Sequence, residues 1–125
     1  MLDTIKYIEV KKNTAEGEKI TKYPMAFTLN IMEVAQKKYG TYTKWFEKLD
    51  GGEAEVDMEA MIWTIESFIN EGLDIENEDL EKPRPLITHK QAGRIISSVG
   101  MGKISIAIKS LVSQSVDTGE SDPNE

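Results

Sequence analysis

Apolar and polar residues alternate at the start of the chain. Residues 5–10 alternate, and residues 19–23 repeat the alternation after a turn-forming segment at 13–17. A period of two is typical of strands with one buried face, so this pattern predicts a β-hairpin within residues 1–24. A lone hairpin is marginally stable in water, so it must dock on helices or pair with another chain. Its open edge is a place where copies of the chain could form a homo-oligomer.

Beyond the hairpin, apolar residues recur at the three-and-four spacing of helices. Thr28 is a suitable N-cap for a first helix, which Gly40 ends. Thr43 is predicted to cap a second, short helix that stops at Asp50-Gly51-Gly52. The core-facing stripe of the first helix is predicted to be Leu29, Met32, Val34, Ala35 and Tyr39, and the second helix carries Trp45, Phe46 and Leu49.

The clearest helical pattern follows Asp57, which is a good N-cap residue. We expect this third helix to end at Gly72, with Leu73 packing back onto Phe68. An acidic connector with prolines then occupies residues 74–85. The apolar positions of the helix are Met58, Met61, Ile62, Ile65, Phe68 and Ile69.

Two further helices are predicted near the C-terminus. Thr88 and Gln91 form a capping box at the start of the first, and Gly100-Met101-Gly102 breaks it. Isoleucines alternate over 104–108 as in a strand, but the neighbouring good helix formers favour a last helix. The buried positions of these two helices are predicted to be Ala92, Ile95, Ile96, Val99, Ile104, Ala107, Ile108 and Leu111.

Together these elements predict an α+β fold that is mainly α-helical. A short N-terminal β-hairpin is followed by about five helices packed as one domain, which suits a chain of 125 residues. The single domain is expected over residues 1–115, with the hairpin at 1–24 and the helical part at 25–115. Residues 116–125 are expected to form a disordered acidic tail.

The charge is unevenly distributed. The chain has a net charge of -7, yet residues 82–116 hold six basic residues and no acidic one. We name these the basic face, and they could meet an acidic partner. General nucleic-acid binding is disfavoured by the overall acidity. The basic residues are Lys82, Arg84, Lys90, Arg94, Lys103 and Lys109.

No targeting signal or membrane-spanning stretch is evident at the sequence level, so we expect no membrane association and a cytoplasmic location. The chain contains no cysteine, which excludes disulfides, thiolate metal sites and cysteine nucleophiles.

Motifs for catalysis and metal binding are incomplete. An EF-hand loop begun at Asp74 would need Gly at 79 and Glu at 85, where the chain has Asp79 and Pro85. His89 is the single imidazole, and the sequence identifies no partner that would orient it as a base. The segment 97–104 lacks the first glycine and the Ser/Thr of a phosphate-binding loop. We therefore predict no enzyme activity, no catalytic residue, no cofactor and no metal.

Residues 88–111 also resemble a DNA-binding helix-turn-helix, and they belong to the basic segment. The second helix of that unit, however, offers no Arg, Asn or Gln before Gln114, so bidentate base readout would be poor. A small helix-turn-helix regulator is therefore the alternative interpretation, and a general protein-binding adaptor is a third.

The apolar residues favour protein binding. Methionine adapts its shape and is common on surfaces that accept varied partners, although the same residues also suit a core. The predicted partner contacts are Met58, Met61, Trp63, Phe68, Ile104, Ile108 and Leu111.

The order of elements resembles a known family. It runs from the β start through 27–40 (FTLNIMEVAQKKYG) to Trp45-Phe46, Met61–Ile65 and Pro85–Thr88. This arrangement, over roughly residues 5–115, is similar to the small acidic tail assembly chaperones of long-tailed bacteriophages and prophages. The resemblance rests on element order and hydrophobic pattern rather than on a diagnostic motif.

The resemblance implies a non-enzymatic role in the bacterial host cytoplasm during phage assembly. Such chaperones bind and solubilise the long helical tape measure protein until tail tube subunits polymerise around it. The tape measure protein, and with it the major tail tube protein, would then be the partners. A chaperone of this kind is not expected in the mature virion.

Overall fold

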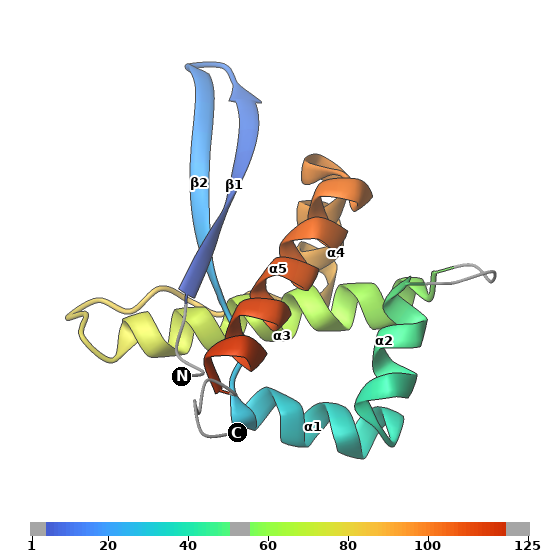
Figure 1. Ribbon diagram of the computed structural model, residues 1–125. Helices are drawn as coiled ribbons and strands as arrows, with labels where there is room; N and C mark the ends of the chain where they lie inside the picture. The colour runs from blue at the N-terminus through green and yellow to red at the C-terminus, as the bar shows by residue number, and fades with distance from the viewer. Residues whose placement is uncertain (1–4, 51–55, 120–125) are drawn as a thin grey trace.

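The computed structural model describes residues 5–50 and 56–119, the last five of these by their backbone alone. A two-stranded hairpin precedes a helical body, as Figure 1 shows. The predicted α+β, mainly helical fold is confirmed. The elements are β1 (Ile5–Thr14), β2 (Gly17–Ala26), α1 (Leu29–Tyr39), α2 (Tyr42–Asp50), α3 (Met58–Asn77), α4 (His89–Val99) and α5 (Met101–Gly119).

The hairpin is longer than its sequence pattern predicts. Its strands pair antiparallel from Ile5 opposite Ala26 to Thr14 opposite Gly17. Residues 11–20 are all exposed, and this outer half projects away from the helices in Figure 1. Only the inner half therefore has the apolar support that an isolated hairpin lacks.

The base of the hairpin crosses α3 at Gly72. Residues 24–27 are buried there, and a Cβ added to Gly72 would lie 2.7 Å from the backbone carbon and oxygen of Pro24. The glycine thus allows strand and helix backbones to touch. The prediction that Gly72 ends the helix is wrong, because α3 continues to Asn77 and Leu73 is a buried helical residue within it. The connector to α4 consequently begins later than predicted, after residue 77.

Two asparagines one heptad apart on α3 hold this connector. The amide of Asn70 accepts from the backbone N–H of Ile87 at 2.8 Å and donates to its carbonyl at 3.0 Å. Asn77 makes the same pair of bonds to Arg84, at 3.0 and 2.9 Å. Each asparagine satisfies a donor and an acceptor of irregular backbone, which keeps the connector against α3 without secondary structure of its own.

Trp45 lies at the centre of an aromatic cluster that joins α1, α2 and α3. It is fully buried, and its ring centroid lies 5.9 Å from those of Phe27 and Trp63. Its indole N–H donates to Thr64 Oγ1 at 2.9 Å. Tyr39 stacks on the same indole at 6.5 Å, and burial raises the pKa of its hydroxyl well above the usual value. The tyrosine therefore remains neutral in this apolar setting.

The first two helices are confirmed, with changes in detail. The side chain of Thr28 donates to Glu71 instead of capping α1. Leu29 and Val34, predicted to face the core, are 65% and 48% exposed, while the buried residues of α1 are Ile31 and Ala35. At the start of α2, the hydroxyl of Thr41 accepts a hydrogen bond from the N–H of Lys44 at 3.1 Å. The predicted cap, Thr43, lies inside the helix. Gly51 and Gly52 lie outside the described residues.

The last two helices meet at a single residue. The predicted capping box of Thr88 and Gln91 is confirmed at the start of α4. Gly100, with a φ of 102°, ends α4, and α5 begins at Met101, so the predicted three-residue break is one residue long. The chain turns by 109° at this joint.

The helical prediction for residues 104–111 is confirmed, and Ile104, Ile108 and Leu111 are buried. The helix α5 continues to Gly119, so the predicted tail at 116–125 overlaps it, and residues 120–125 lie outside the described part. Within the described residues, none of the helices taken singly has the length and apolar character needed to cross a membrane. By length and composition alone, only α4 and α5 together, across their bend, reach that threshold.

Candidate functional site

A hollow with a volume of about 530 Å³ lies between α2 and α5. We call it the α2–α5 groove. Its lining residues recur on each helix at three-and-four spacing, so each wall is one helical stripe. Met61 of α3 contributes to the lining between them. The α2 wall consists of Thr43, Phe46, Glu47, Leu49 and Asp50, and the α5 wall of Ser105, Ile108, Lys109, Val112 and Ser113.

The groove has an apolar interior that remains partly open to solvent. Met61 and Ile108 are buried at its base, with 1% and 4% of their surface exposed. Phe46 and Val112 are half-buried, so their outward surfaces remain available. A long apolar strip between two helices, supported from below by core residues, is the shape that accepts the ridge of a third helix.

Charged residues lie on the two walls of the groove. Glu47 and Asp50 belong to the α2 wall, and Lys109 belongs to the α5 wall. The Nζ of Lys109 lies 3.2 Å from Oδ1 of Asp50, so an ion pair joins the walls at the last turn of α2. Both side chains are more than half exposed, and solvent screening leaves such a pair little energetic weight.

A second, smaller hollow of about 310 Å³ lies between α1 and α3. It is lined by Trp63 but not by Met61, because side chains two positions apart on a helix point in nearly opposite directions. Two of its acidic residues are already engaged, since Glu66 contacts His89 Nδ1 at 3.1 Å and Glu71 accepts from Thr28. This α1–α3 hollow is therefore more polar and less available than the α2–α5 groove.

The seven predicted partner contacts do not form one surface. Met61 and Ile108 lie at the base of the α2–α5 groove, and Trp63 lines the α1–α3 hollow. Met58 is 47% exposed but lines neither. The remaining three fill the core and are unavailable to a partner in this structure, which corrects the prediction for Phe68, Ile104 and Leu111.

The sequence did not identify the half-buried apolar residues of the groove as partner contacts. Phe46 was noted only as part of the second helix and Val112 was not singled out, because their half-exposure depends on how α2 and α5 pack across some sixty residues of chain. One signal was present in the sequence: a charged residue directly follows an apolar one on each helix, Glu47 on α2 and Lys109 on α5. This places a charge beside each apolar stripe, as on a face that is partly exposed. That signal alone does not say which two helices face each other.

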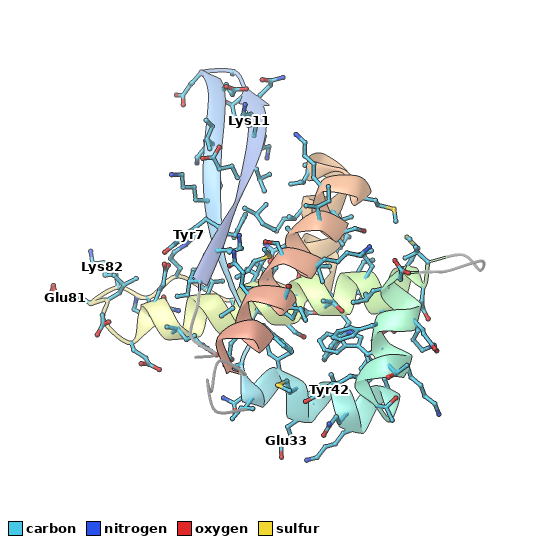
Figure 2. The ribbon with its side chains drawn as sticks, viewed as in Figure 1. Tyr7, Lys11, Glu33, Tyr42, Glu81 and Lys82 are labelled. Carbon is cyan, nitrogen blue, oxygen red and sulfur yellow. The ribbon has the colours of Figure 1, made fainter. Side chains whose placement is uncertain are left out.

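The predicted basic face is not a single surface, which corrects that prediction. Arg84 supports the hairpin, because its guanidinium donates to the Lys22 carbonyl and lies 5.4 Å from the Tyr23 ring. Lys82 lies beside Glu81, beyond the end of α3 (Figure 2). Lys109 is paired with Asp50. The other three, on α4 and α5, are exposed and make no ion pair with a described residue: Lys90, Arg94 and Lys103.

The helix-turn-helix alternative is matched by the 109° angle between α4 and α5, but not by their connection or by the outer face of α5. DNA-binding units of that type join their helices by a turn of three or four residues, whereas α4 and α5 are joined by Gly100 alone. The outward stripe of α5 is centred on Ile106, which is 70% exposed and offers no hydrogen bond to a base edge.

His89 has a partner that the sequence did not identify. Its contact with Glu66 joins the first turn of α4 to α3, and the imidazole lines neither hollow. Within residues 5–50 and 56–119, no group of three or more His, Cys, Asp or Glu side chains is placed to hold a metal ion. These observations assign His89 a positional contact between helices.

No protein-family model, curated protein or solved structure matches the chain.

Proposed function

We propose that the protein is a non-enzymatic assembly chaperone that holds an amphipathic helix of a client protein in the α2–α5 groove. The observation that carries this proposal is the apolar strip of Phe46, Met61, Ile108 and Val112 between two helices. Helix-in-groove recognition uses such a strip, with client anchors at i, i+3, i+4 and i+7.

The size of the groove suits a short segment of a long client. The nine residues of α2 give a wall roughly 14 Å long, which matches two to three turns of helix. One such contact is weak, but a client with many similar segments would carry many chaperone molecules. The net charge of -7 would then keep the coated client dispersed.

The resemblance drawn from element order supports a particular client. We propose that it is the tape measure protein of a long-tailed bacteriophage, held in the host cytoplasm until the major tail tube protein polymerises around it. A tape measure protein is long and helical, so it supplies the repeated amphipathic segments that the groove would accept.

The test is co-expression with a helical tape measure fragment that is insoluble alone. Wild-type protein should keep the fragment in the soluble fraction, and Phe46→Ser should lose most of this effect because it removes an anchor from the groove. The matched control is Ile106→Ser, which removes a more exposed apolar side chain from the outer face of α5. The melting temperature of each variant, followed by circular dichroism, shows that the fold is retained.

Three outcomes would contradict the proposal. The fragment could remain insoluble with wild-type protein, or Phe46→Ser and Ile106→Ser could act alike. The complex could also dissociate steeply as salt is raised, which is typical of phosphate contacts and would favour the DNA-binding alternative. Apolar client binding should instead persist or strengthen in salt.

A further inference from the structure

The two walls of the α2–α5 groove carry opposite charge. Among the described residues that line the groove, the charged groups of the α2 wall are the carboxylates of Glu47 and Asp50, and that of the α5 wall is the ammonium of Lys109. The other described lining residues are apolar or uncharged. A helix seated between them would have a different electrostatic neighbour on each flank.

The ion pair between the walls does not prevent such seating. Asp50 and Lys109 are 62% and 69% exposed, and their contact of 3.2 Å involves two flexible side chains. Separating an exposed pair costs little, and both groups can find new partners on an incoming helix. Glu47 forms no ion pair with a described residue, so its carboxylate is available from the start.

We propose that these wall charges fix the direction in which a client helix lies in the groove; this inference rests on the proposed helix-binding function. The fitting client helix has an apolar ridge, a basic flank that faces α2 and an acidic flank that faces α5. Turning a helix end over end while its ridge still faces the groove exchanges its two flanks. Hence one direction matches both walls, and the other opposes like charges on both sides.

The consequence is specific to helix geometry. A peptide in which the basic and acidic flanks are exchanged should bind as well as the first, but in the reverse direction. A peptide with two acidic flanks meets repulsion from α2 in either direction. We expect its affinity to be about three- to tenfold weaker, as several exposed charge contacts would allow.

The probes are two synthetic 14-residue amphipathic helices of identical composition. Each has leucines on the ridge, lysines on one flank, glutamates on the other and a hydrocarbon staple on the solvent side, and the second has the flanks exchanged. A nitroxide label on the peptide N-terminus broadens the NMR signals of nearby backbone amides. One peptide should broaden amides near Thr43, at the start of α2, and the other those near Asp50, at its end.

The matching protein variant is E47K/D50K/K109E, which exchanges the wall charges. All three residues are exposed, so the fold should be retained, and the direction of both peptides should reverse. The control is E33K/K37E, which reverses an exposed ion pair on α1, outside the groove, and should leave both directions unchanged.

The results separate this inference from the proposed function. Binding of both peptides in one direction, or no reversal in the triple variant, would overturn the directional proposal and leave helix binding intact. Absence of binding by either peptide would overturn both the directional proposal and the groove as a helix-binding site. Opposite directions that reverse in the triple variant would support it.

Discussion

The two halves of α3 have different roles. In its C-terminal half, the hairpin crosses at Gly72, Asn70 and Asn77 hold the connector, and Tyr7 donates a hydrogen bond to Glu76. Figure 2 shows Tyr7 at the base of the hairpin, beside this half of the helix. In its N-terminal half, α2 is attached through aromatic rings and leaves an apolar groove over Met61.

This difference shows how one helix can be a structural support and part of a binding site. At the hairpin end, hydrogen bonds and direct contact between backbones hold the hairpin and the connector against α3, and they fix the geometry of the fold. At the α2 end, apolar packing supports the groove from below but does not cover it. Breaking the hairpin end should therefore cost stability, whereas the α2 end contains surface whose loss should affect a partner more than the fold.

The largest effect is expected at the crossing of β2 and α3. Gly72→Ala places a Cβ 2.7 Å from the carbonyl carbon and oxygen of Pro24. Because these two Pro24 atoms belong to the backbone, they cannot move away without moving the strand. We expect a loss of about 3 kcal/mol in the free energy of unfolding, measured by urea denaturation. Gly102→Ala is the control, because its Cβ meets nothing within 4 Å and alanine favours helix. Equal stability of the two variants would show that the crossing is not tight.

The connector should be next in sensitivity. Asn70→Ala leaves the N–H and carbonyl of Ile87 without their partner in a partly buried site. A loss of about 2 kcal/mol is expected from unsatisfied backbone groups. Asn30→Ala, at an exposed position of α1, is the control and should change stability little. Hydrogen exchange at Ile87 should speed up in the first variant alone, and unchanged protection there would argue against the clamp.

At the α2 end, the hydrogen bond from Trp45 to Thr64 gives a smaller effect. Thr64→Val keeps the shape but leaves the buried indole N–H unpaired, which should cost about 1.5 kcal/mol. In a Trp45→Phe background there is no indole N–H to leave unpaired, so Thr64→Val should lower the free energy of unfolding by less. A double-mutant cycle measures this coupling, and additive costs would mean that the bond contributes nothing.

The smallest effect concerns the N-cap of α3. The hydrogen bond from the Ala60 N–H holds the pKa of Asp57 below its usual value. A carboxylate with a lowered folded-state pKa stabilises the protein above its unfolded pKa of 3.8, and this stabilisation is lost as pH falls through the lowered value.

Asp57→Asn keeps a cap acceptor but does not titrate. Its stability should therefore fall less steeply than that of wild type on acidification below about pH 4. Urea denaturation at several acidic pH values measures the slope. The matched control is Asp79→Asn, which removes a carboxylate from the exposed connector without removing a cap. A slope that is the same in Asp57→Asn and wild type would contradict the assignment.

Local signals in the sequence correctly predicted the starts of α3 and α4. Asp57 and the Thr88–Gln91 box act within four residues of themselves, so their chemistry is the same in any fold. Gly72 shows where this reasoning fails. Its local pattern is that of a helix terminator, yet the residue is needed because a strand nearly fifty residues away touches the helix there.

The candidate site was less predictable for the same reason. Met61 and Ile108 were predicted as partner contacts and line the groove, but Phe68 and Leu111 were predicted too, and they have the same helical spacing without lining it. Spacing shows that a residue faces other elements, and only the arrangement of α2 against α5 decides which apolar residues line the groove.

The joint at Gly100 has a consequence for how the chain can change in length. Because Gly100 alone joins α4 to α5, no loop is present to absorb an inserted residue, and an insertion there would displace the buried stripe of α5 relative to α4. The exposed turn between Thr14 and Gly17 imposes no such constraint. Insertions and deletions should therefore accumulate at the hairpin tip during evolution, while the spacing between Val99 and Ile104 is kept.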